Sequence, residues 1–203
     1  MMNPATSPAA VLCLASASPR RRELLAQIGV LHDVEPANVD ETRRPQEPPR
    51  DYVLRVARDK ALEVHSRRPQ APVLAADTAV VLDSRVYGKP RDRQDGLAML
   101  AALSGRAHRV LTAVALVTSA GLSCATSEST VRLRATCAAE REAYWETAEP
   151  FDKAGAYAIQ GLGAVFIESL EGSFSGVMGL PLFETAGLLG AAGVPFWVGR
   201  ARS

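Results

Sequence analysis

The amino-acid sequence predicts an α/β protein built on a mixed, partly antiparallel twisted sheet that helices flank. The first observation is size, because 203 residues with 47% hydrophobic content can bury a sizeable core as one domain or two closely joined lobes. The second is the apolar run at residues 73–81, whose length and β-branched content suit an interior strand. The third is the alternation of strand-like and helix-like segments, with hairpin signals between some of them.

The N-terminal region predicts a strand and then a helix with an anion site at its start. Residues 11–15 form a short apolar strand, and the helix has Ser18 as N-cap, Pro19 at its first position and Gly29 near its end. Residues 20–22 place three arginines in the first turn, where the helix dipole favours acidic side chains. Backbone N–H groups, serine hydroxyls and guanidinium groups together predict a phosphate site, and a solvated basic turn is the alternative.

The next segments predict a short strand, a polar loop and a long helix. Residues 33–37 suit the strand, the pair Asp40 and Glu41 is able either to hold a metal or to lie in water, and residues 43–50 are rich in proline. The helix covers residues 51–65, and its apolar positions recur at helical spacing with Lys60 among them. Lys60 therefore either extends its stem to solvent or points into a cleft.

Asp77 lies at the centre of the apolar strand at residues 73–81. An unpaired carboxylate at such a position costs several kcal/mol or takes up a proton, so Asp77 is expected to have donors, a cation or a metal nearby. A structural carboxylate that caps a turn is the alternative, and the strand by itself favours that alternative.

The remaining elements follow from turn residues and apolar patterns. Residues 83–85 form a tight turn, so residues 86–90 return as a hairpin and bring Lys89 towards the strand of Asp77. We expect a helix at 92–103, antiparallel strands at 110–118 and 131–134 joined by a polar connection, a helix at 138–147, a strand at 163–170, a flexible loop at 173–179 and a helix from 181 to 189. Residues 149–161 show neither a helical nor a strand period. They contain an acid, a base, an amide and glycines, which is typical of a binding loop.

Composition excludes several classes of function. The net charge of +1 argues against general nucleic-acid binding, and no stretch reads as a membrane span. Three cysteines and three histidines are scattered singly, so neither a disulfide framework nor a zinc site is supported. Residues 1–10 contain no basic residue and do not resemble an export signal, which predicts a cytoplasmic protein. Only three of the 23 basic residues are lysines, Lys60, Lys89 and Lys153, which suggests positions where a compact ammonium is needed.

The motifs together resemble the Maf family of nucleoside triphosphate pyrophosphatases, from residue 14 to about residue 189. The resemblance rests on LASASPRRRELL at 14–25, ARDKA at 57–61, ADT at 76–78, GKP at 88–90, LSGRAH at 103–108, EPFDKAGAYAIQG at 149–161 and VMGLP at 177–181. It implies two lobes around a nucleotide-binding cleft, in which a triphosphate is cleaved between its α and β phosphates with Mg²⁺ or Mn²⁺. We expect a single domain at residues 11–195 with tails at 1–10 and 196–203. A homodimer is compatible with the resemblance.

The resemblance also implies roles for individual residues. Asp77 is the catalytic carboxylate, as general base or metal ligand, and Glu41 is a second carboxylate near the metal. The phosphates are held by Ser16, Arg20 and Arg21. Charge in the transition state is neutralised by the three lysines, of which Lys60 and Lys89 are catalytic and Lys153 binds substrate.

Three positions resemble the branch of the family that acts on dTTP and UTP: Arg20, Thr78 and Gln160. The amide of Gln160 offers both a donor and an acceptor to a uracil or thymine edge, whereas a carboxylate would better suit a cationic methylated guanine. One alternative is a pyrophosphatase of 7-methyl-GTP, or of modified pyrimidine nucleotides, on the same fold. The other is a nucleotide-binding regulator of cell division that performs no catalysis.

Overall fold

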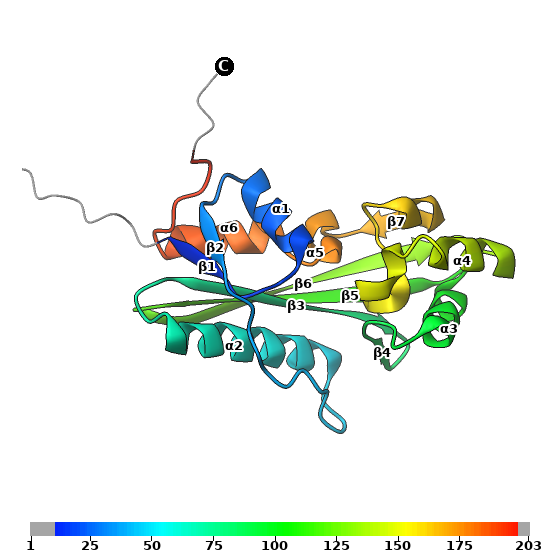
Figure 1. Ribbon diagram of the computed structural model, residues 1–203, viewed down its shortest axis with the longest axis horizontal. Helices are drawn as coiled ribbons and strands as arrows, with labels where there is room; N and C mark the ends of the chain where they lie inside the picture. Colours follow the sequence, from blue (N-terminus) through cyan, green and yellow to red (C-terminus); the bar gives the residue numbers. More distant parts are fainter. Residues whose placement is uncertain (1–10, 199–203) are drawn as a thin grey trace, which may run out of the picture.

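The computed structural model describes residues 11–198, and its centre is one mixed seven-stranded sheet (Figure 1). The strand order is β2-β1-β3-β5-β6-β7, and β4 pairs with β3 off this path. The strands are β1 (Leu12–Leu14), β2 (His32–Val34), β3 (Val73–Leu82), β4 (Arg85–Tyr87), β5 (Ala107–Thr118), β6 (Gly121–Leu133) and β7 (Ile167–Glu171). β1 runs parallel to β2 and β3, and the other pairs are antiparallel. The predicted α/β class with a partly antiparallel sheet is confirmed.

Helices cover both faces of the sheet and one of its ends. They are α1 (Pro19–Gln27), α2 (Pro49–Arg67), α3 (Arg93–Leu103), α4 (Ala138–Trp145), α5 (Phe174–Met178) and α6 (Leu182–Ala191), with 3₁₀ turns at Glu149–Asp152, Ala154–Ala156 and Leu162–Phe166. In Figure 1, α2 lies below the sheet and α1, α5 and α6 lie above it. α3 and α4 lie at the right, at the end of the long strands that is farther from β1 and α6. The two faces of the sheet are therefore covered by different helices, and α3 and α4 cover one end.

The stripe predicted for the long helix is the buried face of α2. Its buried residues are Val53, Val56, Ala57, Lys60, Ala61 and Val64. The apolar members of this face pack against small residues of the sheet such as Ala75, Ala79 and Ala113. Small side chains on the strands let the helix approach closely, and so the stem of Lys60 reaches the centre of β3.

One edge of β3 has no neighbouring strand at its middle. β1 pairs with Val73 and Leu74 of that edge, and β4 pairs with residues 80–82, while β5 covers residues 73–81 on the opposite edge. Successive side chains of a strand point to opposite faces, so Asp77 faces α2 and Thr78 faces α1 and α5. Because the sheet is open between β1 and β4, side chains on both of its faces can reach one space.

Three local predictions are wrong. Residues 122–130 belong to β6 rather than to a polar connection, since they pair with β5 and place Ser127 and Ser129 in buried positions. Residues 162–166 form a 3₁₀ turn before β7. Residues 174–178 form α5 rather than a flexible loop, with the Ser173 hydroxyl accepting from the Gly176 N–H at the start and Gly179 in the left-handed conformation at the end.

The predicted domain boundaries lie close to the limits of the described residues. The tail at 1–10 and most of the tail at 196–203 lie outside the described residues. Within the described part, the Trp197 N–H donates to the Ile28 carbonyl and the Val198 N–H to the Gly29 carbonyl. The chain is thus attached to the end of α1 as far as residue 198, and the division into one domain and two tails stays a prediction.

Candidate active site

A cavity of about 620 Å³ lies over the open edge of β3. Its walls include every residue that the sequence proposed for the site: Ser16, Arg20, Arg21, Glu41, Lys60, Asp77, Thr78, Lys89, Lys153 and Gln160. These residues come from α1, α2, β3 and four connecting segments. Arg22, the third arginine of the helix start, is exposed and does not line the cavity.

The floor of the cavity holds an ammonium group between two carboxylates. The Lys60 Nζ lies 2.9 Å from Asp77 Oδ1 and 3.0 Å from Glu41 Oε2. Lys60 and Asp77 are only 7% and 6% exposed, whereas the Glu41 side chain is 55% exposed. Burial raises the pKa of Asp77 above its usual range, although Lys60 and Arg21 oppose the shift. The site therefore contains a carboxyl group that binds a proton more readily than an ordinary aspartate.

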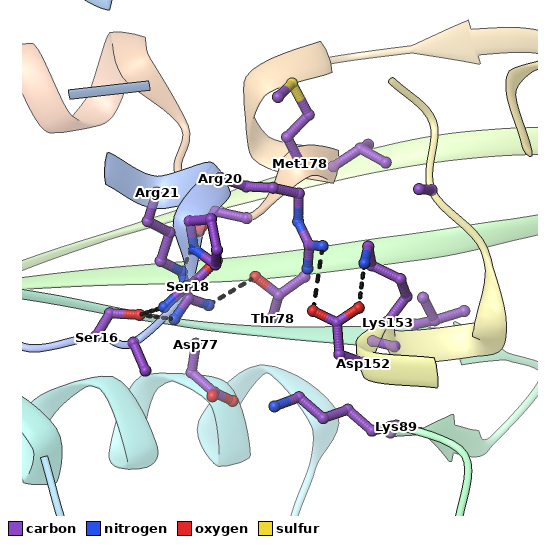
Figure 2. A pocket seen from close by; sticks show the side chains of 18 of the residues that line it. Ser16, Ser18, Arg20, Arg21, Asp77, Thr78, Lys89, Asp152, Lys153 and Met178 are labelled. Carbon is purple, nitrogen blue, oxygen red and sulfur yellow. Dashed lines mark hydrogen bonds and ion pairs between the residues drawn. The ribbon is translucent and has the colours of Figure 1, made fainter. Parts of the chain in front are cut away.

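Arg21 is fixed by three hydrogen bonds on the other face of the sheet (Figure 2). Its Nε donates to the Gly179 carbonyl at 2.8 Å, and its two terminal nitrogens donate to Ser16 Oγ at 3.1 Å and Thr78 Oγ1 at 3.4 Å. Ser16 also accepts from the Ser18 N–H at 3.2 Å. A guanidinium group held by hydrogen bonds in this way keeps its position before a ligand arrives.

Thr78 belongs to a chain of hydroxyl groups beneath Arg21. Its Oγ1 lies 3.0 Å from the Oγ1 of Thr112 on β5, and Thr112 donates to the Gly176 carbonyl at 2.8 Å. Thr112 is buried, and Gly176 belongs to α5. This chain joins the sheet to the helix that closes one wall of the cavity.

At the mouth of the cavity, Asp152 lies between two cationic side chains (Figure 2). It pairs with Lys153 and, at 3.7 Å, with Arg20 Nη1. Partial burial raises the pKa of Asp152, but the hydrogen bond and charge of Lys153, together with the charge of Arg20, leave that pKa lowered. Figure 2 shows the Lys89 side chain pointing towards the Asp77 carboxylate from the end of the β3–β4 hairpin. The hairpin prediction that brought Lys89 to this strand is confirmed.

The predicted binding loop at residues 149–161 forms the wall opposite α1. The N–H of Gly155 donates to the Gly88 carbonyl at 3.0 Å, which attaches the loop next to Lys89. Gly155 has a φ of +72°, and a Cβ there would lie 3.1 Å from Val80, so glycine suits this position best. Gln160 is exposed at the end of the loop and lines the cavity.

Tyr157 of this loop is held by a buried histidine. The Tyr157 hydroxyl lies 2.8 Å from His108 Nε2, and the rings meet edge to face at 5.4 Å between centroids. Burial lowers the pKa of His108 from 6.5 to about 4, and its Nδ1 is a buried nitrogen without a partner. His108 is therefore neutral in the folded protein at pH 7.

Acidification is expected to destabilise the fold through His108. Its folded-state pKa is lower than its unfolded value, so its contribution is complete above about pH 6.5 and is lost as the pH falls towards 4, by up to about 3 kcal/mol. Urea unfolding at several pH values measures this loss. His108→Gln keeps a polar group for Tyr157 but does not titrate, so its unfolding free energy is expected to fall less steeply over the same range. Parallel curves for the two proteins would contradict the assignment.

Sequence reasoning missed several residues of the cavity. In the sequence, Asp152 is only one of the acidic residues of the loop, and nothing singles out Tyr157 in the wall or Thr112, which lies beneath Thr78. Tyr52 of α2 also lines the cavity, and burial together with Asp77 and Glu41 raises its pKa to about 12. Tyr52 falls one position before Val53 of the predicted stripe, which was the only signal available for it.

Glu41 and Asp77 are the two carboxylates on the cavity floor that could hold a divalent cation together, since both contact the Lys60 ammonium. Among residues 11–198 no group of three or more histidine, cysteine, aspartate or glutamate side chains is arranged to hold a metal. Mg²⁺ is commonly bound by one or two carboxylates together with substrate phosphates and water. Glu41 and Asp77 converge on one point, the Lys60 ammonium, so this pair fits an ion that the substrate helps to hold.

Among the described residues, no helix combines the length and apolarity that a bilayer crossing requires.

Comparison with known proteins shows the family. Residues 11–192 match the family model described as Maf-like protein. A dTTP/UTP pyrophosphatase of Bordetella avium is 57% identical over 192 residues, which cover 90% of this chain and 96% of the relative. Proteins of the same name from Anaeromyxobacter sp. and Saccharophagus degradans are 56% and 53% identical, over 91% and 92% of this chain and 90% of each relative. The chain therefore belongs to the family of Maf-like proteins.

Proposed function

We propose that this protein hydrolyses dTTP and UTP between the α and β phosphates and releases the nucleoside monophosphate and pyrophosphate. The observation that carries the proposal is a cavity in which the buried pair of Asp77 and Lys60 faces several further cations. Relatives that are more than half identical over most of the chain are named dTTP/UTP pyrophosphatases, which supports the same activity here.

The cationic side chains of the cavity suit a triphosphate. Arg20 and Arg21 stand at the start of α1, where backbone N–H groups and Ser16 add donors. Lys89 and Lys153 approach from the hairpin and the loop. A phosphoryl transition state spreads negative charge over several oxygens, so we propose that these groups hold the phosphates and neutralise that charge.

We propose that Asp77 activates the attacking water. A carboxyl group with a raised pKa is a better proton acceptor than an ordinary aspartate, and its position beside Lys60 keeps it oriented. The water oxygen would bond to the α phosphorus, the bond from this phosphorus to the bridging oxygen would break, and pyrophosphate would leave. Direct coordination of a metal by Asp77 is the second way in which this carboxylate can act.

Glu41 and Asp77 would hold a divalent cation such as Mg²⁺ or Mn²⁺ together with phosphate oxygens. Such an ion, when bound, supplies positive charge to the triphosphate. Lys60 stands between the same two carboxylates, so it would keep them apart and partly neutralised before substrate enters. Gln160 would then read the base with its amide, and Arg20 and Thr78 would complete the preference for pyrimidines.

A substrate panel tests the proposed function. We expect purified protein with Mn²⁺ to release one pyrophosphate per monophosphate from dTTP and UTP, with kcat/KM at least about 10-fold higher than for 7-methyl-GTP. Chelation of the metal is expected to abolish release. Faster cleavage of 7-methyl-GTP would overturn the specificity, and release of orthophosphate in place of pyrophosphate would overturn the cleavage position.

Three further points stay predictions. We propose a cytoplasmic location, where nucleoside triphosphates are abundant, and a homodimer is one oligomeric state to test by light scattering. The near-neutral net charge supports the expectation that nucleic acid is not a partner.

A further inference from the structure

The segment that carries Gln160 is held by two side chains that do not line the cavity, Tyr144 at the end of α4 and Glu149 at the start of the loop. Before Gln160, the N–H of Ala158 donates to the Tyr144 hydroxyl at 3.1 Å. The Tyr144 hydroxyl in turn donates to Glu149 Oε1 at 2.7 Å. Tyr144 is thus the link between the loop and the carboxylate.

After Gln160, the carboxylate of Glu149 accepts two backbone hydrogen bonds. The Leu162 N–H donates to Oε2 at 2.8 Å and the Gly163 N–H donates to Oε1 at 2.9 Å. Partial burial raises the pKa of Glu149, but the bonds from Tyr144 and these two amides outweigh it and leave the pKa lowered. An ionised carboxylate accepts all three bonds, and so the backbone is fixed on both sides of Gln160.

Two glycines, Gly161 and Gly163, allow the backbone to approach Glu149 and Tyr144 closely. A Cβ at Gly161 would lie 2.0 Å from Glu149 Oε2, and a Cβ at Gly163 would lie 2.5 Å from the Tyr144 hydroxyl. The Tyr144 ring is itself 5% exposed and packs edge to face on Phe166 at 5.2 Å between centroids. Side chains at either glycine would displace the backbone next to Gln160.

We propose that Glu149 and Tyr144 are positioning residues for base recognition, because they fix the backbone from which Gln160 reaches the base. The inference rests on the proposed function, since it takes a pyrimidine nucleotide as the ligand. Neither residue contacts the cavity, so both act on the ligand only through the loop. Their loss should weaken contacts to the base and leave contacts to the phosphates unchanged.

The test compares a ligand that has a base with one that lacks it. Tyr144→Phe keeps the ring on Phe166 and removes only the hydroxyl. Titration calorimetry is expected to show UMP binding weakened about 10-fold, while ribose 5-phosphate binds as in the wild type. Gln160→Ala is expected to give the same selective loss, and the double variant no further loss, because both changes remove one function. In turnover, KM for UTP is expected to rise more than kcat falls.

Glu149→Gln provides a second variant, since an amide has one acceptor oxygen for three donors. Glu146→Gln is the matched control, because Glu146 is exposed and its ion-pair partner within residues 11–198 is Arg93 at the surface. Equal weakening of both ligands, or additive effects of Tyr144→Phe and Gln160→Ala, would overturn the positioning role. Equal affinity of the wild type for UMP and ribose 5-phosphate would also overturn it. These binding measurements need no turnover, whereas the proposed function fails if pyrophosphate is not released.

Discussion

Asp77→Asn is expected to lower kcat for dTTP and UTP by about 10²–10⁴-fold, the range in which a positioned general base contributes. Asparagine keeps the size of the side chain and an oxygen towards Lys60, but it cannot take up a proton. Thermal stability is expected to stay near the wild-type value, because Lys60 retains Glu41 as a partner and burial, which raises the pKa of Asp77, disfavours the charge that asparagine removes. Pyrophosphate release and thermal melting of the same preparations measure both effects.

Asp83→Asn is the matched control for this substitution. Asp83 lies in the exposed turn of the same hairpin with a φ of 54°, a conformation that asparagine tolerates well. An Asp77→Asn variant with full turnover would contradict the proposed mechanism. An unfolded variant would return Asp77 to the structural role that its strand alone suggested, and a folded wild type without turnover would favour the non-catalytic regulator.

Lys60→Met is expected to lower the free energy of unfolding by about 3–5 kcal/mol, as removal of one partner from a buried ion pair does. Methionine fills the space of the Lys60 stem on the apolar face of α2 but leaves the Asp77 carboxylate without its nearest cation. Urea unfolding at pH 7 measures the loss. The activity of this variant is expected to be lost as well.

The double variant Lys60→Met/Asp77→Asn separates charge from packing. It is expected to recover most of the lost stability, because the neutral amide needs no cation, and failure to recover would mean that packing causes the loss. Lys60→Arg keeps the charge, yet the planar guanidinium cannot replace one nitrogen at 2.9 and 3.0 Å from two carboxylates. We expect it to lower kcat by about 10²-fold, and an unchanged rate would mean that the scarcity of lysine in this chain is coincidental.

Much of the site followed from chemistry that is local in the sequence. Lys60 was identified because a charged residue interrupts an apolar helical stripe, and Asp77 because a carboxylate interrupts an apolar strand. Each is unfavourable alone, and the structure shows that they lie opposite each other at 2.9 Å. The local patterns place Ser16 in an anion site and Gln160 in a binding loop, and only the resemblance supplies their specific roles.

The elements that were missed depend on distant contacts. Ser127 and Ser129 take inward positions of β6, so a polar stretch is a strand because β5 pairs with it along its length. α5 has five residues, which is too short to show a helical period. The opening between β1 and β4 that unites both faces of the sheet is a property of strand pairing, and no single segment of the sequence contains it.

The hydroxyl groups of Thr78 and Thr112 beneath Arg21 can orient their protons in only one way. The carbonyl of Gly176 can only accept, so the single proton of Thr112 points to it, and the proton of Thr78 must then point to Thr112. Arg21 already uses one lone pair of Thr78, which leaves one lone pair for a ligand and no proton to give. Towards a ligand in the cavity, Thr78 can therefore act only as an acceptor: its free lone pair can receive a donor such as an imide N–H, and the hydroxyl has no proton for a bare lone pair.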